Sequence, residues 1–215
     1  MTPNNTVPLQ VIANLVEVHA PSIGAGLAEL YALDAAREFC RRAQVVHRDL
    51  TIYGPSGAGD FEVPVPDGLE IVRIQSIHKA TQCGGVVEVT DRYGFRAPSH
   101  LYQIHQSCTD TCEETALTLV VSVSPTSGAT EVPAELVDYA LAIASGAVAK
   151  AVMIPTQRDL NTSMKPTEIK ATAASAALMS AHHSKIFETA IRNAGHTRVW
   201  GQTRQKPSLR GKGFV

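Results

Sequence analysis

Aromatic residues are scarce in this chain of 215 residues: they make up 5% of it, whereas hydrophobic residues of all kinds make up 44%. That hydrophobic fraction is enough to form a core in one domain or in two small ones. Because large rings are the usual anchors of deep ligand pockets, their scarcity favours closely packed helices over a deep small-molecule site.

Features of several other protein classes are also missing. Four cysteines are too few for a disulfide scaffold in a chain of this length. Residues 1–10 have neither a basic region nor an apolar core, so we expect no signal peptide. No run of about 18 apolar residues is present to predict a membrane span. We therefore expect a protein that assembles in the cytoplasm.

Charge is distributed unevenly along the chain. The formal net charge is −1, but no acidic residue follows Glu188. The six basic residues beyond it leave −7 for the rest of the chain, and they are Arg192, Arg198, Arg204, Lys206, Arg210 and Lys212. This asymmetry is the strongest indication in the composition that the C-terminal tail contacts a partner.

Hydrophobic residues recur every three or four positions in three segments, which predicts helices over residues 26–44, 132–153 and 166–194. Gly146 lies inside the second of these, where glycine costs about 1 kcal/mol relative to alanine. We expect a neighbouring helix to pack closely against it as compensation. The segment 7–18 fits either a helix or a strand.

The chain between the first two helices has a different pattern. Short alternating stretches such as 69–74 and 117–123 are separated by turn residues at intervals of roughly ten, which is typical of a small sandwich or barrel. Pro64 and Pro66 predict a strand at a sheet edge. The predicted fold class is α+β, a bundle of N- and C-terminal helices with an inserted β-sandwich or barrel module. The predicted domains are 1–47 plus 131–195 (helical), 48–130 (β) and 196–215 (an extended basic C-terminal arm).

One group of residues has the right types for zinc but a poor spacing. His100, His105, Cys108 and Cys112 follow one another as His-x4-His-x2-Cys-x3-Cys rather than as paired CxxC or HxxxH hooks. The favoured interpretation is a set of loop and strand-edge residues. A zinc hydrolase or a metal-stabilised module is the alternative.

No other pattern predicts catalysis. Cys40 lies on the alanine-rich face of the first helix, so we expect a small core residue rather than a nucleophile. The glycine-rich segment 54–59 lacks the Gly-Lys-Ser/Thr ending of a phosphate loop. His182 and His183 are expected on a polar helix face, with a pH switch as the alternative. We expect neither enzymatic activity nor a cofactor.

The tail 196–215 has no hydrophobic periodicity, and Gly195 is expected to end the helix before it. One interpretation is a tail that binds nucleic-acid phosphates through its charges. A second is an arm that orders on a partner protein, which the apolar residues among the basic ones favour. A solvated tail without a partner is a third interpretation. The residues expected to make the contact are Arg198, Trp200, Arg204, Lys206, Leu209, Arg210, Lys212, Phe214 and Val215.

Short motifs in a fixed order extend over nearly the whole chain. They are Ala20-Pro21, Leu33 with Ala35-Ala36-Arg37-Glu38-Phe39-Cys40-Arg41-Arg42, Leu119 through Ser124-Pro125-Thr126, Pro133-Ala134-Glu135-Leu136, Gly146-Ala147, Phe187 with Ala190 and Ala194, and Arg210-Gly211-Lys212-Gly213-Phe214-Val215. In these motifs the chain resembles the head-to-tail adaptor (neck, connector or head completion) proteins of tailed bacteriophages. It departs from them at Ala43 and Val46, where threonine and an aromatic are common, and over 156–164, where a tryptophan is expected.

The resemblance implies a structural virion protein of the neck, assembled in the host cytoplasm and without a membrane partner. Such a protein docks as a ring, commonly a dodecamer, under the portal protein through its C-terminal arm. The ring joins the capsid vertex to tail, nozzle or tail-terminator proteins and forms part of the channel through which DNA passes. The alternative is a nucleic-acid-binding protein that uses the basic C-terminal tail.

Overall fold

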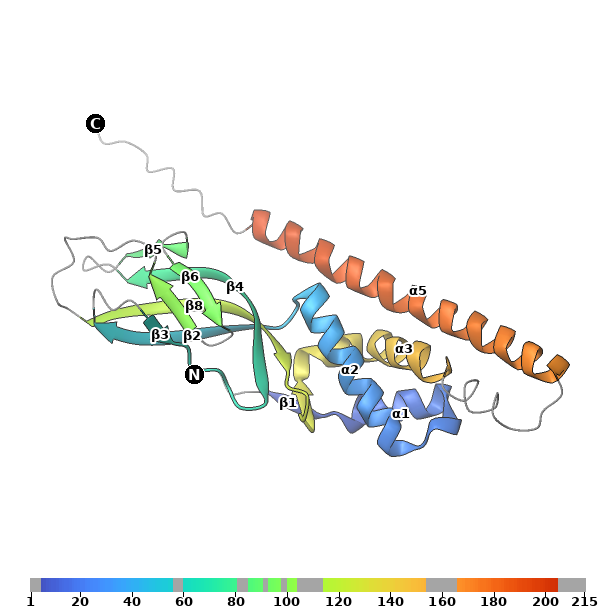
Figure 1. Cartoon of the computed structure of the whole chain (residues 1–215). Coiled ribbons are helices and arrows are strands. Elements are labelled where there is room, and N and C mark those ends of the chain that lie inside the picture. Colours follow the sequence, from blue (N-terminus) through green and yellow to red (C-terminus); the bar gives the residue numbers. More distant parts are fainter. Residues whose placement is uncertain are drawn as a thin grey trace.

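The computed structural model describes residues 5–55, 60–80, 85–90, 93–97, 100–103, 114–153 and 166–204. Helices gather at one end of the molecule and antiparallel strands at the other (Figure 1). The fold is therefore mixed helix and sheet, which confirms the predicted α+β class. No helix in the described part of the chain is long and apolar enough to cross a bilayer.

The segment 7–18, for which the sequence fits either a helix or a strand, contains both. Strand β1 (Thr6–Pro8) is followed by helix α1 (Gln10–His19), which buries Ile12, Ala13 and Val16. A short 3-10 helix, η1 (Pro21–Ile23), then turns the chain back.

Helix α2 (Ala25–Ala43) matches the predicted helix over 26–44. Gly24 precedes it with a φ of 74°, a backbone conformation that glycine adopts without strain. Its alanine-rich face is buried, and Phe39 and Cys40 are fully enclosed there. The small side chains let other elements approach this face closely, as the sequence pattern predicts.

Strand β8 (Glu114–Pro125) is a central strand of the larger sheet. It pairs antiparallel with β2 (His47–Pro55) on one side and β4 (Leu69–Ala80) on the other, and β5 (Val86–Glu88) extends the sheet beyond β4. From Val121 to Pro125 every residue of β8 is buried, whereas earlier in the strand burial alternates: Leu117 and Leu119 are fully buried, and Ala116, Thr118 and Val120 are half-buried. This period of two confirms the strands that were predicted from the alternating pattern.

A smaller sheet has the order β3 (Asp60–Glu62), β7 (His100–Gln103), β6 (Tyr93–Ala97). β3 lies at its edge and ends before Pro64, which confirms an edge strand at this place. A proline has no N–H to donate to a ladder, so pairing stops there. The closure of the two sheets into a sandwich or barrel stays a prediction.

The second predicted helix begins later than expected. Val132 lies in β9 (Glu131–Pro133), where it pairs with Val7 of β1, and η3 (Ala134–Tyr139) is a 3-10 helix. Only α3 (Ala140–Ala151) is α-helical. The prediction of a helix from 132 is wrong because the N-terminal strand supplies a pairing partner that local periodicity does not reveal.

Helix α5 (Pro166–Arg204) is longer than predicted. Gly195 ends a helix readily when it takes a positive φ, but the described glycines with positive φ are Gly24 and Gly68. The helix therefore continues through Gly195, and the expectation that an extended arm begins at residue 196 is wrong as far as Arg204. The division into domains stays a prediction.

The helices pack in layers. α2 and α3 contact each other and both contact α1, whereas α5 packs mainly on α3 and also touches α2 (Figure 1). One continuous hydrophobic cluster extends from these helices through Val46 into the inner side of β8. The helical part and the larger sheet therefore share a core.

Gly146 of α3 is in close contact with Phe187 of α5. A Cβ atom added to Gly146 would lie 2.7 Å from the Phe187 ring, which is closer than such atoms come. The Phe187 ring also lies 5.9 Å from the Phe39 ring of α2, measured between centroids. The close approach predicted at Gly146 is confirmed, and the neighbour is an aromatic ring.

We predict that Gly146→Ala lowers the free energy of unfolding by about 1–3 kcal/mol, because the added methyl group overpacks the Phe187 ring. Helix propensity alone would give the opposite sign, a gain of about 1 kcal/mol. Urea unfolding followed by circular dichroism measures the difference. Gly195→Ala is the matched control, since a Cβ there meets nothing within 4 Å and should be neutral or stabilising. A Gly146→Ala chain as stable as the control would contradict the prediction.

Candidate functional site at the base of the C-terminal arm

The predicted partner-binding residues begin within the last turns of α5. Arg198, Trp200 and Arg204 belong to that helix. The others lie outside the described residues, and they are Lys206, Leu209, Arg210, Lys212, Phe214 and Val215. The described part of the site is therefore the stretch of α5 that holds the arm to the body.

Apolar packing fixes this stretch of α5. Phe187, Ile191 and Ala194 recur at spacings of four and three, so they lie on one face of the helix, and all three are buried. Nearer the start of α5, the Ser180 hydroxyl donates a hydrogen bond of 2.8 Å to the carbonyl oxygen of Ala149 in α3. Ala194 is the last buried residue of α5 among those whose burial the structure describes, and the basic tail follows it in sequence.

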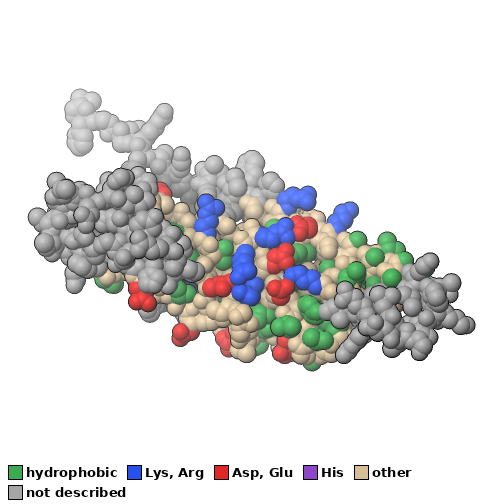
Figure 2. Space-filling model, in the orientation of Figure 1, with side chains coloured by type: hydrophobic (Ala, Val, Ile, Leu, Met, Phe, Trp, Pro, Cys, Tyr) green, Lys and Arg blue, Asp and Glu red, His purple; other side chains and the backbone are tan. Residues whose placement is uncertain are grey.

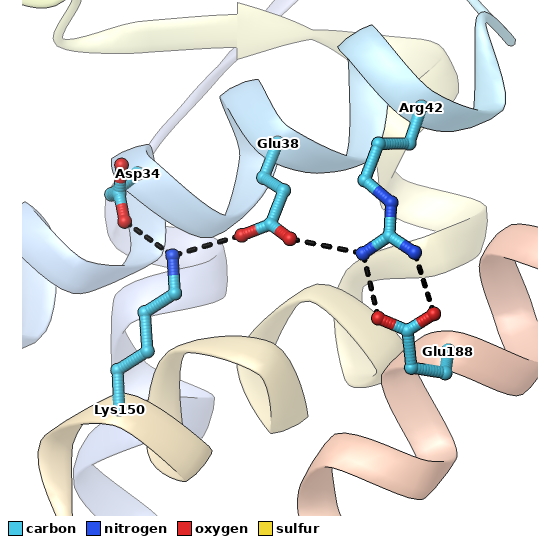
Figure 3. Close-up of polar contacts among 5 residues, drawn as sticks. All are labelled: Asp34, Glu38, Arg42, Lys150 and Glu188. Carbon is cyan, nitrogen blue, oxygen red and sulfur yellow. Dashed lines mark hydrogen bonds and ion pairs between the residues drawn. The ribbon is translucent and has the colours of Figure 1, made fainter.

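A chain of charged side chains reinforces the packing (Figure 3). Arg42 of α2 binds Glu188 of α5 through two hydrogen bonds, each 2.6 Å, in the parallel geometry that a guanidinium and a carboxylate favour. Arg42 also donates to Glu38 at 3.0 Å. Lys150 of α3 contacts Glu38 at 2.9 Å and Asp34 at 2.5 Å. The alternating charges thus join α2, α3 and α5.

The hydrogen bonds of this row favour the ionised forms of Glu188, Arg42 and Lys150. The hydrogen bonds from Arg42 lower the pKa of Glu188, and those to Glu188 are the main reason that the pKa of Arg42 is raised. Burial alone would lower the pKa of Lys150, but the hydrogen bonds to Asp34 and Glu38 outweigh it and the pKa is raised. The base of the arm is therefore a set of fixed charges at neutral pH.

Further ion pairs connect the helices to the strands. Glu70 of β4 accepts from Arg41 at 2.8 Å and from Arg37 at 3.4 Å. Arg48 of β2 binds Glu135 of η3 at 2.6 Å. Figure 2 shows basic and acidic side chains in an alternating band across the middle of the molecule, over α2 and its neighbours. The acids of this band are largely neutralised within the chain.

The two predicted histidines of the polar face differ in their surroundings. His182 is exposed, whereas the ring of His183 lies 5.6 Å from the ring of His19 in α1. Burial, with the neighbouring His19 and His182, lowers the pKa of His183. The Nδ1 atom of His183 is buried without a hydrogen-bond partner among the described residues. His183 therefore lies between α5 and α1, as expected for a polar face that passes between helices, whereas His182 is exposed.

The alternative of a zinc site is not tested by the described residues. His100 belongs to β7, and His105, Cys108 and Cys112 lie outside the described ranges. Within those ranges, no group of three or more histidine, cysteine, aspartate or glutamate residues could hold a metal ion. Cys40 is buried as predicted, and burial raises the pKa of its thiol to about 12, with smaller contributions from Glu135 and Glu70.

Sequence reasoning missed the ion pairs that hold α5 to α2. Asp34, Glu38 and Arg42 follow one another at intervals of four, which places them along one side of a helix. That spacing, with Glu188 as the last acidic residue of the chain, was the available signal. No protein-family model and no curated protein matches the chain.

We predict that a thiol reagent labels Cys40 in the folded protein more slowly than in urea by roughly a hundredfold or more, since burial excludes both the reagent and the thiolate. The substitutions Cys83→Ser, Cys108→Ser and Cys112→Ser leave Cys40 as the one thiol to be followed at mildly alkaline pH. Equal rates in the folded and unfolded chain would show that Cys40 is accessible.

The pair Arg42–Glu188 should show a coupling free energy of about 1 kcal/mol or less in a double-mutant cycle, because both side chains are partly exposed. Arg42→Gln and Glu188→Gln, singly and together, would be unfolded in urea. Since folding lowers the pKa of Glu188, the coupling should persist above the ordinary carboxyl pKa and fade as pH falls through the folded value. A coupling that stays constant into strong acid would contradict this assignment.

Proposed function

We propose that the chain is a structural virion protein, a head-to-tail adaptor that docks as a ring under the portal through its C-terminal arm. The ring, a dodecamer in this proposal, joins the capsid vertex to tail, nozzle or tail-terminator proteins and contributes to the DNA channel. The finer architecture belongs to the proposal too: a helical bundle, an inserted β-sandwich or barrel, and a basic arm.

The observation that carries the proposal is the anchoring of α5, the helix that precedes the arm in sequence. α5 is held to α2 and α3 by the Phe187–Gly146 contact and the Arg42–Glu188 pair, and beyond Glu188 every charged residue is basic. A long helix locked at its middle presents the residues that follow at a fixed place. Fixing the base of an arm reduces the entropy that docking costs, which suits a segment that must find one partner.

The composition of the arm favours a protein partner. Trp200, Leu209, Phe214 and Val215 stand among the basic residues. Side chains of this kind fill pockets on a protein surface, whereas phosphate binding needs only the charges. The absence of acidic residues after Glu188 is also the specific feature that supports the second candidate, a nucleic-acid-binding protein.

The deciding experiment measures binding of the purified chain to the cognate portal ring by mass photometry and negative-stain imaging. Three chains would be compared: the full chain, one truncated after Arg204, and one truncated after Gly195. We expect only the full chain to form a complete ring on the portal, because both truncations remove the apolar anchors of residues 205–215. Equal thermal unfolding of the three chains, read by circular dichroism, shows that the body is intact.

A full chain that ignores the portal but binds DNA at low salt, and loses that binding when residues 196–215 are removed, would replace the adaptor with the nucleic-acid-binding protein. Binding of both truncated chains to the portal as complete rings would leave an adaptor whose docking does not use the arm.

A further inference from the structure

The outer face of α5, defined here by Leu178, His182, Lys185 and Ile186, is open, and Lys185 is the one charged residue of this set. From residue 171 to 181 the helix has no charged side chain, and no residue there is buried. Leu178 is 73% exposed and Ile186 is 37% exposed. Lys185 lies two residues from the buried Phe187, about 200° around the helix, so this face points away from the body. A helical stretch such as 171–181 without a charged residue is atypical of a solvated helix.

A second apolar surface is the α1–α2 groove, a hollow of about 340 Å³. Its walls come from the start of α1, the first turns of α2 and the turn before β9, and the residues used below are Leu9, Gly26, Glu29, Leu30 and Leu33. Leu30 is 58% exposed at the rim, and Leu27 beside it is 43% exposed. The groove and the outer face of α5 share no residue.

The two surfaces lie on opposite sides of the helical part. Leu33 lines the groove, and Arg42 binds α5; they are nine residues apart on α2, which turns the helix by about 900° and places them half a turn from each other. α2 and α3 lie between α1 and α5 (Figure 1). Figure 2 shows hydrophobic side chains both along α5, away from the strands, and along the edge where α1 lies.

The charges of the two surfaces are complementary. Lys185 stands on the outer face of α5, and Glu29 stands in the wall of the α1–α2 groove. Among the residues that the structure describes, neither forms an ion pair. One surface carries a lysine and the other a glutamate. Pairing of these two charges fixes the register of the contact as well as its partner.

We propose that the occupant of the α1–α2 groove is the outer face of α5 from a second copy of this chain. A contact between two different faces on opposite sides of one molecule repeats from copy to copy, and it closes into a ring when the rotation per copy allows. The inference rests on the proposed function, because it names the faces that build the adaptor ring. It is tested in the absence of the portal.

A charge exchange tests the register. The full chain, Lys185→Glu, Glu29→Lys and the double variant would be compared by sedimentation velocity over a wide concentration range at low salt. We expect the wild-type chain to form species larger than a dimer as concentration rises. Each single variant should weaken association by about tenfold or more, since like charges then meet, and the double variant should restore it.

Blocking one face at a time tests whether two different faces meet. Leu178→Glu places a charge on the outer face of α5, and Leu30→Glu places one at the rim of the groove, so each substitution blocks one face. Each variant alone should be monomeric, but an equimolar mixture should form dimers and nothing larger, because one good face remains on each chain. Val86→Glu is the control: Val86 is 69% exposed on β5, remote from both faces, and its substitution should leave association unchanged. Thermal unfolding confirms that each variant is folded.

A wild-type chain that stays monomeric throughout the concentration range overturns the proposal. So does a mixture of the two blocked variants that fails to form dimers, or association that survives both substitutions. A closed dimer of the wild-type chain would show a contact between like faces instead. If the portal assay succeeds while these fail, the adaptor function stands and these faces are wrong; the reverse outcome leaves a self-associating protein without that function.

Discussion

The ring of Phe187 against the backbone of Gly146 is the contact on which the arrangement of the helices depends. It lets α5 approach α3 more closely than any side chain at position 146 would permit, and it brings the same ring within 5.9 Å of Phe39 in α2. Around this point α5 is held, whereas no residue from 171 to 181 is buried. One aromatic residue in a chain with few of them therefore decides where the longest helix sits, and a glycine that weakens its own helix makes that possible.

Ion pairs next to the buried Phe187 add to the contact between α5 and the other helices. Glu188 follows Phe187 directly, and its two hydrogen bonds to Arg42 connect α5 with the row of charges that passes through Glu38 to Lys150. The acidic side chains of this row form ion pairs with basic side chains of the same chain. No acidic residue follows Glu188 in the sequence, and in the proposed function the basic residues beyond it contact a partner. Glu188 is therefore both the last acidic residue of the sequence and the residue of α5 that pairs with Arg42.

The two halves of α5 have different roles in this view. Its second half is anchored and leads to the arm, which in the proposed function reaches the portal. Its first half has an open apolar face, which in the further proposal meets the α1–α2 groove of the next copy. A helix shared by both contacts would couple them, since docking of the arm fixes the direction in which the outer face points. Lateral packing and portal binding would then support each other through one rigid element.

The sequence by itself determined the local elements and their burial: the alanine face of α2, the alternation of β8, the buried Cys40 and the close approach at Gly146 were all predicted from periodicity and residue size. Its charge pattern also placed the candidate site after Glu188. Tertiary structure alone decided that Val132 pairs with Val7 as a strand, that α5 continues through Gly195, and that Arg42 meets Glu188. The physical reason is the separation in sequence between the residues that meet. Periodicity records which face of an element is buried, but pairing partners and ion pairs join residues more than a hundred positions apart, and the fold chooses them.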